Sequence, residues 1–138
     1  MPHPHRLAVR VRYGEVDRGD RTHHSVYLVY FEMGRTELLR ARGLAYADME
    51  RRGRFVAIAH ADLRYRGAAR YDDELIIETE VRQVRGARVV FGNRVLRADP
   101  GGETVIAEAT ITGALIDAAG RPVRFTAQEA ARLLGDGA

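Results

Sequence analysis

Several features are missing from this sequence, and each absence narrows the class of protein. No cysteine is present, which excludes a disulfide framework and thiolate chemistry. No apolar run approaches the roughly 20 residues of a membrane-spanning helix. The first six residues, Met1 to Arg6, lack the apolar segment of a secretory signal. We therefore expect a soluble protein of the cytoplasm that has no membrane partner.

Lysine is also absent, so all 22 basic residues are arginine. The net charge is +3, and the arginines are interleaved with Asp and Glu rather than gathered in one patch. A nucleic-acid-binding protein usually concentrates its basic residues on one face. The pattern predicts no nucleic-acid partner and leaves a mild attraction for anionic ligands.

The length of 138 residues and the hydrophobic fraction of 46% fit one folded domain, expected to span residues 1–138. Apolar and polar residues alternate in five segments, which is the pattern of half-buried strands. The expected strands cover residues 7–13, 55–65, 75–82, 89–95 and 105–115. Gly86 and the segment Asp99 to Gly102 are expected to be turns, and residues 14–24 are polar and are expected to form a loop.

A long helix is expected between that loop and the second strand. Ser25 can serve as its N-cap, and Gly43 follows its expected end at Arg42. The first half of this helix is apolar nearly all round, which predicts a buried helix. Shorter helices are expected at residues 45–52 and 125–134, the last one capped by Thr126.

Small side chains stand at regular positions in two of the expected strands. They are Ala57, Ala59, Ala61, Ala107, Ala109 and Gly113. A sheet face with so little bulk can receive a helix rich in Tyr, Leu and Phe, because protein interiors pack to a nearly constant density. The prediction is an α+β protein with a long central helix wrapped by a curved antiparallel sheet of about five strands. This is the hotdog fold.

Two segments carry a resemblance to a known family. The first runs from Val11 to Asp17 and continues through His24, Tyr27 and Phe31-Glu32; the second runs from Tyr65 to Leu75. In order and spacing this pattern resembles the 4-hydroxybenzoyl-CoA thioesterase-like family, over about residues 6–116. The resemblance implies hydrolysis of acyl-CoA thioesters without metal or cofactor. It also implies that Asp17 is the catalytic carboxylate and that the backbone around His24 polarises the thioester carbonyl.

The chain departs from the family pattern at three positions. Asp20 stands where the family usually has a second glycine, Val26 where it often has Asn, and Ala68 where it has Pro. The change at Asp20 can alter the shape of the loop or add a charge beside the site. We expect it to affect the choice of substrate more than the reaction.

The residues themselves suit thioester hydrolysis. Asp17 can attack the carbonyl and form a mixed anhydride, or it can act as a general base on water, and the sequence does not separate these routes. Unpaired N–H groups at the start of the long helix can stabilise the oxyanion. His24 and Tyr27 are the other candidate catalytic residues, His24 to orient Asp17 or bind water. The alternative for Tyr27 is a core aromatic side chain.

Other charged groups allow competing interpretations. Glu32 and Arg35 share one helical face and are expected to pair within the chain or across a dimer interface. A glutamate on the central helix is nevertheless the catalytic residue in another branch of hotdog thioesterases. A metal site built from His3, His5, His23 and His24 is conceivable, but no zinc-hydrolase spacing is present and we expect no metal.

Arg85 and Arg88 flank the expected turn at Gly86 and are predicted to bind the CoA phosphates; solvated turn charges are the alternative. Because one hotdog unit leaves sheet edges open, we expect a homo-oligomer, a tetramer built from two dimers. Competing functions are an acyl-ACP thioesterase and a non-catalytic acyl-CoA-binding module. A hotdog dehydratase would need an Asp-x-Asn-Pro-x-His segment, which is absent from the sequence.

Overall fold

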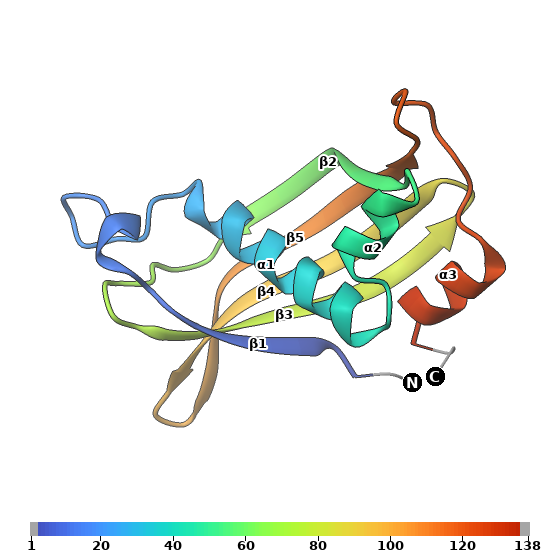
Figure 1. Cartoon of the computed structure of the whole chain (residues 1–138). Coiled ribbons are helices and arrows are strands. Elements are labelled where there is room, and N and C mark those ends of the chain that lie inside the picture. The colour runs from blue at the N-terminus through green and yellow to red at the C-terminus, as the bar shows by residue number, and fades with distance from the viewer. Residues whose placement is uncertain (1–2, 136–138) are drawn as a thin grey trace.

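The computed structural model describes residues 3–135 and forms one sheet with three α-helices and one short 3-10 helix. The elements are β1 (His5–Arg10), the short 3-10 helix η1 (Tyr13–Glu15), α1 (Val26–Ala41), α2 (Tyr46–Arg51), β2 (Phe55–Tyr65), β3 (Glu74–Arg85), β4 (Arg88–Asp99), β5 (Gly102–Ile116) and α3 (Ala127–Leu133). The five strands pair antiparallel in the order β1-β3-β4-β5-β2. Figure 1 shows α1 crossing one face of this sheet. The predicted hotdog architecture is confirmed.

The central helix covers only part of the sheet. α1 packs mainly on β3, β1 and β4, and the strand at the far edge, β2, is not among its principal neighbours. Two clusters of buried side chains lie beneath the helix, one around Phe31 and Ile77 and the other around Leu38 and Phe91. Gly34 lets the helix approach β3 closely, since a Cβ atom there would lie 2.5 Å from Thr79 Oγ1.

The small residues of the sheet are not all placed as predicted. Ala107 and Ala109 are buried in the cluster that contains Phe31 of α1, as expected. A β-bulge between Ile58 and His60 adds a residue to β2, and Val56 rather than Ala57 then pairs with the buried Leu115. A one-residue insertion exchanges the two faces of a strand, so the expectation for Ala57 was wrong. Ala59 and Ala61 are exposed because β2 is an edge strand that α1 does not cover.

Three local predictions also need correction. Tyr13 lies in η1 and not in the first strand, which ends at Arg10. Ser25 stands at the N-cap position of α1, but its side chain makes no capping hydrogen bond. The first half of α1 is not buried all round, since Val29 is 48% exposed and Leu28 and Met33 are exposed as well. By contrast, Thr126 caps α3 together with Glu129 as predicted.

In residues 3–135 we find no helix with the length and apolar character needed to span a membrane.

Candidate active site

The loop between η1 and α1 is held in shape by its own backbone. Val16 and Thr22 form an isolated antiparallel bridge at its base. Above the bridge, Asp17 N–H donates to Arg21 O over 2.8 Å and Asp20 N–H donates to Asp17 O over 3.1 Å. The buried Thr22 ties the loop to the segment before β3, because its N–H and its hydroxyl both donate to Ala69 O. Asp17 is therefore carried on an ordered turn.

The Asp17 carboxylate is exposed, and one of its oxygens is fixed by the backbone. Oδ1 accepts the N–H of Gly19 over 2.9 Å and the N–H of Arg21 over 3.3 Å. These two bonds orient the carboxylate. Within residues 3–135 no protein group donates to its Oδ2, which leaves that oxygen for a substrate or a water molecule.

Glu15 supports this loop from below and was not anticipated from the sequence. Glu15 is buried, with 8% of the residue exposed. One oxygen accepts the Tyr30 hydroxyl and the Arg12 N–H, each over 2.8 Å, and the other accepts the Arg12 guanidinium over 3.1 Å. Burial opposes ionisation, but these hydrogen bonds outweigh it and hold the pKa of Glu15 below its ordinary value. The carboxylate thus joins the loop to the second turn of α1.

We expect Glu15→Gln to lower the free energy of unfolding by about 1–3 kcal/mol, because a buried hydrogen-bonded charge is lost. A depressed folded-state pKa gives stability that is present above the unfolded value and lost as pH falls through the folded value. The difference in Tm between wild type and variant should therefore be full near pH 7 and shrink below about pH 4.5. Thermal unfolding between pH 3 and pH 7 measures it, with the exposed Glu32→Gln as control. A difference that stays constant down to pH 3 would contradict this role.

The N-terminal end of α1 lies directly after this loop, and His23 prepares it. The His23 carbonyl accepts the Val26 N–H over 2.9 Å, and its ring Nδ1 lies 2.8 Å from Ser25 Oγ and 3.2 Å from Ser25 N. His23, for which no role was expected, therefore replaces the Ser25 side chain in capping the helix. In the described part of the chain, the His24 N–H has no hydrogen-bond acceptor. It is a free donor at the positive end of the helix dipole.

The His24 and Tyr27 side chains have different surroundings. The His24 ring is exposed and stacks on His23, with 4.2 Å between the ring centroids. Tyr27 is only 2% exposed, and its hydroxyl accepts the Ala69 N–H over 3.2 Å. Tyr27 therefore holds the segment before β3, whereas His24 is open to a ligand.

The expected pair of Glu32 and Arg35 is not formed within the chain. Glu32 is exposed, whereas Arg35 is 6% exposed and turns toward the sheet. Its guanidinium carbon lies 5.9 Å from the centroid of the Phe91 ring. A cation over an aromatic face is a favourable contact, which accounts for the inward orientation of Arg35.

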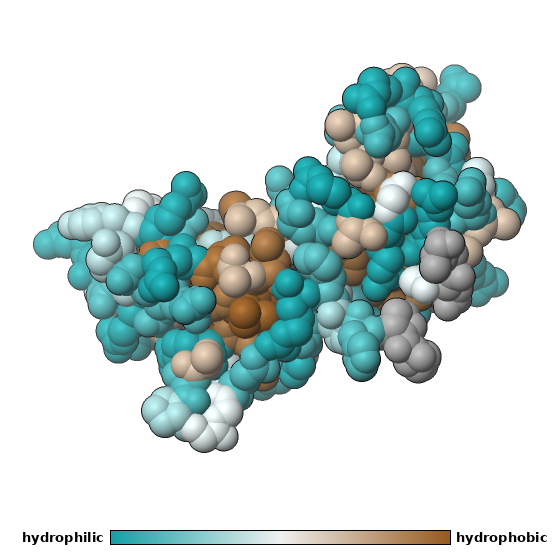
Figure 2. Space-filling view, turned by 60° about the horizontal axis from the view of Figure 1, so that its bottom comes forward, coloured by the Kyte–Doolittle hydropathy of each residue, from teal (hydrophilic) through white to brown (hydrophobic). Residues whose placement is uncertain are grey.

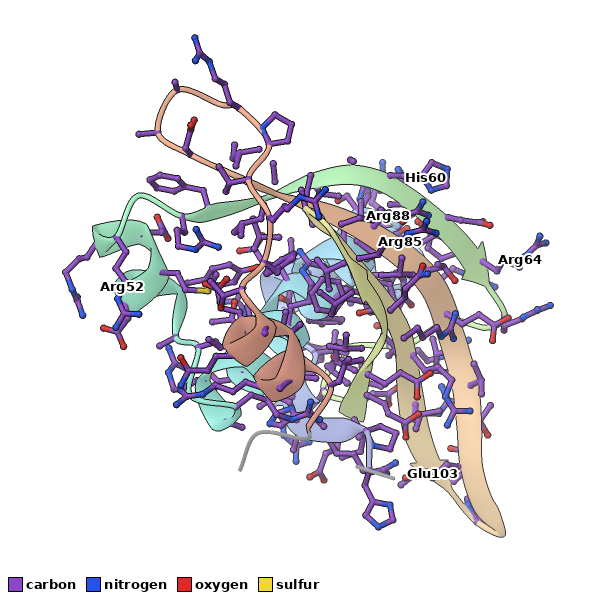
Figure 3. The ribbon with its side chains drawn as sticks, turned by 90° about the vertical axis from the view of Figure 1, so that its right-hand side faces the viewer. Arg52, His60, Arg64, Arg85, Arg88 and Glu103 are labelled. Atoms are coloured by element: carbon purple, nitrogen blue, oxygen red, sulfur yellow. The ribbon has the colours of Figure 1, made fainter. Side chains whose placement is uncertain are left out.

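Arg85 and Arg88 are not brought near Asp17 within one chain. They face each other at the β3–β4 turn, whereas the Asp17 loop meets the opposite end of these strands (Figure 1). Figure 3 shows the two arginines close together, with His60 beside Arg88. The twelve residues of β3 separate the two ends by roughly 36 Å. No group of three His, Cys, Asp or Glu side chains among residues 3–135 is placed to hold a metal ion.

The architecture is that of a hotdog protein, and comparison with known proteins places it in the thioesterase class. Residues 11–133 match the sequence model of the thioesterase-like superfamily. The acyl-CoA thioesterase YbgC of Haemophilus influenzae is 36% identical over 120 residues, 85% of each chain. The acyl-CoA thioester hydrolase YbgC of Escherichia coli O6:H1 is 34% identical over 113 residues, 81% of each chain. The chain belongs to the thioesterase-like superfamily.

Solved structures show the same fold. A 4-hydroxybenzoyl-CoA thioesterase mutant in complex with 4-hydroxybenzoyl-CoA superposes with a TM-score of 0.88, over 96% of this chain and 99% of that chain. Its sequence identity of 19% supports the fold alone. A hypothetical protein of Aquifex aeolicus is 26% identical, with a TM-score of 0.85 over 93% of this chain and 98% of that chain.

Proposed function

We propose that this protein hydrolyses acyl-CoA thioesters to the free acid and CoA, with Asp17 as the catalytic carboxylate and no metal or cofactor. The observation that carries the proposal is an exposed carboxylate, fixed through Oδ1 and open at Oδ2, in the loop that leads into α1 of a thioesterase-family chain. The cytoplasmic location expected from the sequence is part of the proposal. Substitution of Asp17, argued in the Discussion, tests it.

The reaction needs a nucleophile on one side of the thioester and hydrogen-bond donors on the other. In one route Oδ2 of Asp17 attacks the carbonyl carbon, the CoA thiolate leaves, and water hydrolyses the mixed anhydride. In the other route Asp17 takes a proton from the attacking water. In both, the free His24 N–H at the helix end donates to the developing oxyanion. Tyr27 acts as a positioning residue through its bond to Ala69.

A second copy of the chain is the proposed partner, with two such dimers forming a tetramer. β2 is an edge strand, so its outer backbone groups are open for pairing. The apolar residues Leu28, Val29 and Met33 of α1 and Ile58 of β2 are exposed in the single chain. On the face drawn in Figure 2, a compact hydrophobic patch is surrounded by hydrophilic side chains. Pairing of β2 with a second β2 would give α1 a neighbouring helix and extend the sheet.

This pairing would also bring Arg85 and Arg88 to the site. Antiparallel pairing about a two-fold axis places the turn end of one sheet beside the loop end of the other. Arg88 lines a shallow hollow on the outer face of the sheet, together with His60 and small residues of β5. We propose that these arginines bind the CoA phosphates of a substrate whose thioester lies at the partner's Asp17.

We expect Arg85→Ala/Arg88→Ala to raise KM for an acyl-CoA by roughly tenfold with little change in kcat, because two charge-assisted contacts to phosphate are lost. The N-acetylcysteamine thioester, which lacks the nucleotide, should be insensitive to the change. Light scattering should show an assembly larger than a monomer. Steady-state kinetics with both substrates separate a loss of nucleotide binding from a general structural effect. A structural effect would lower kcat/KM equally for both substrates.

Co-expression of this variant with Asp17→Asn, followed by purification on two different tags, tests the shared site. A mixed assembly contains one site with an intact Asp17 from one chain and intact arginines from the other. It should turn over acyl-CoA with the wild-type KM, whereas the arginine variant alone should show the raised KM and Asp17→Asn alone the lowered kcat. A mixed assembly that stays defective, or a wild-type chain that is monomeric at micromolar concentration, would contradict the proposal.

A further inference from the structure

Two aromatic side chains stand unusually open beside Asp17. Tyr13 is 77% exposed and Tyr71 is 51% exposed, the largest fractions among the exposed large hydrophobic side chains of residues 3–135. They come from separate segments, η1 and the loop before β3, yet their ring centroids are only 5.5 Å apart with an interplanar angle of 57°. Both line an open hollow on the surface together with Asp17. Such a pair of rings offers an apolar wall next to the carboxylate.

Tyr71 is held at this place by Asp20. Asp20 Oδ1 accepts the Tyr71 N–H over 3.0 Å, and its other oxygen lies 3.9 Å from a guanidinium nitrogen of Arg70. The backbone of Asp20 has φ = 54°, a conformation that favours glycine. This is the position where the resembling family usually has glycine. Here a side chain occupies it and ties the catalytic loop to the loop that carries Tyr71.

The hollow suits an acyl group better than the nucleotide of CoA. Its lining carries two carboxylates, Asp17 and Asp20, against the single guanidinium of Arg18, so its charge is on balance negative and does not favour phosphates. Its wall is formed by the tyrosine rings, and an aromatic face binds uncharged apolar groups and other rings at centroid distances of about 4.5–7 Å. The part of the substrate that must lie next to Asp17 is the acyl carbonyl, so the rings are within reach of the group attached to it.

We propose that Tyr71 with Tyr13 contacts the apolar part of the acyl group and sets the preference for acyl groups larger than acetyl, and that Asp20 is the positioning residue that holds Tyr71. The proposal rests on Asp17 being the catalytic carboxylate. It assigns the departure at Asp20 a role in substrate choice: a glycine there would relieve the backbone but release Tyr71.

The measurement is the ratio of kcat/KM for benzoyl-CoA to kcat/KM for acetyl-CoA. We expect Tyr71→Ala to lower this ratio by about tenfold through KM for benzoyl-CoA, the effect of one lost aromatic contact. Asp20→Gly should lower it by several-fold, because the loop is freed while the backbone conformation is still allowed. Asparagine keeps an acceptor for the Tyr71 N–H and tolerates positive φ. Asp20→Asn should therefore retain the wild-type ratio. Melting temperatures and light scattering accompany each variant.

Each other result overturns the inference. If Asp20→Gly and Asp20→Asn give the same ratio, the bond to Tyr71 does not position the wall. If Tyr71→Ala lowers kcat/KM equally for both substrates, the ring pair has a structural role. If it breaks the assembly, the ring pair belongs to an interface between chains. A wild type active on acetyl-CoA but not on benzoyl-CoA also refutes it and leaves the proposed function intact, whereas hydrolysis of neither thioester rejects the proposed function itself.

Discussion

Asp17→Asn is expected to lower kcat on an acyl-CoA substrate by about 10²–10⁴-fold, the cost of losing a positioned base, and by more if the carboxylate is the nucleophile. Asparagine keeps the side-chain size and an oxygen that can accept the Gly19 and Arg21 N–H groups, so the loop should keep its shape. Because the residue is exposed, the free energy of unfolding should stay within about 0.5 kcal/mol of wild type. Single-turnover and steady-state rates, with Tm beside them, measure the effect.

Glu32→Gln is the matched control. Glu32 is also an exposed carboxylate, but it lies on α1, where a different branch of hotdog thioesterases carries the catalytic group. We expect this variant to keep wild-type turnover and stability. Wild-type turnover in Asp17→Asn would overturn the mechanism, and an inactive Glu32→Gln of unchanged Tm would move the catalytic carboxylate to the helix.

Gly34→Val is expected to have the largest effect on stability, a loss of about 3 kcal/mol or more in the free energy of unfolding. The first added carbon alone would lie 2.5 Å from Thr79 Oγ1 and 2.8 Å from Ile77 Cγ2. α1 would have to move away from β3, and the contacts of Phe31 and Tyr30 in the core would loosen. Chemical denaturation followed by circular dichroism measures the loss.

Two further variants test whether this contact is the cause. Gly34→Ala should lower the free energy of unfolding by less, because alanine has a helix propensity about 1 kcal/mol more favourable than that of glycine. Adding Thr79→Ala to it should recover stability, since the crowding hydroxyl is removed and, within the described residues, that hydroxyl has no hydrogen-bond partner. A Gly34→Val variant as stable as wild type would show that the helix is free to shift.

The position of α1 also determines where the Asp17 loop sits. Glu15 reaches Tyr30 in the second turn of this helix, and His23 caps its first turn. Any displacement of α1 from β3 is therefore passed to the Asp17 loop and to the His24 N–H. We expect Gly34 variants that still fold to lose activity as well as stability, with kcat affected more than KM.

Local chemistry was enough to predict most of the secondary structure. Alternating apolar residues predicted all five strands, and an apolar segment followed by Gly43 predicted α1. Both predictions were possible because the periods of strands and helices differ and can be recognised within a short stretch of sequence. The polar segment before the apolar helix predicted a loop that carries Asp17, and the family resemblance implied the class of protein, which the family comparison confirms. The catalytic role of Asp17 itself stays a prediction.

What the sequence by itself determined is thus the order and type of the elements and the motif from which the site is predicted. Only the tertiary structure decided which faces meet. The bulge at Ile58 turned Ala57 away from the core, because one inserted residue reverses a strand's faces. Burial of Glu15 depends on Tyr30, fifteen residues away, and the bond from Tyr71 to Asp20 joins segments fifty-one residues apart. Such contacts arise only when distant segments pack together, so no local sequence pattern predicts them.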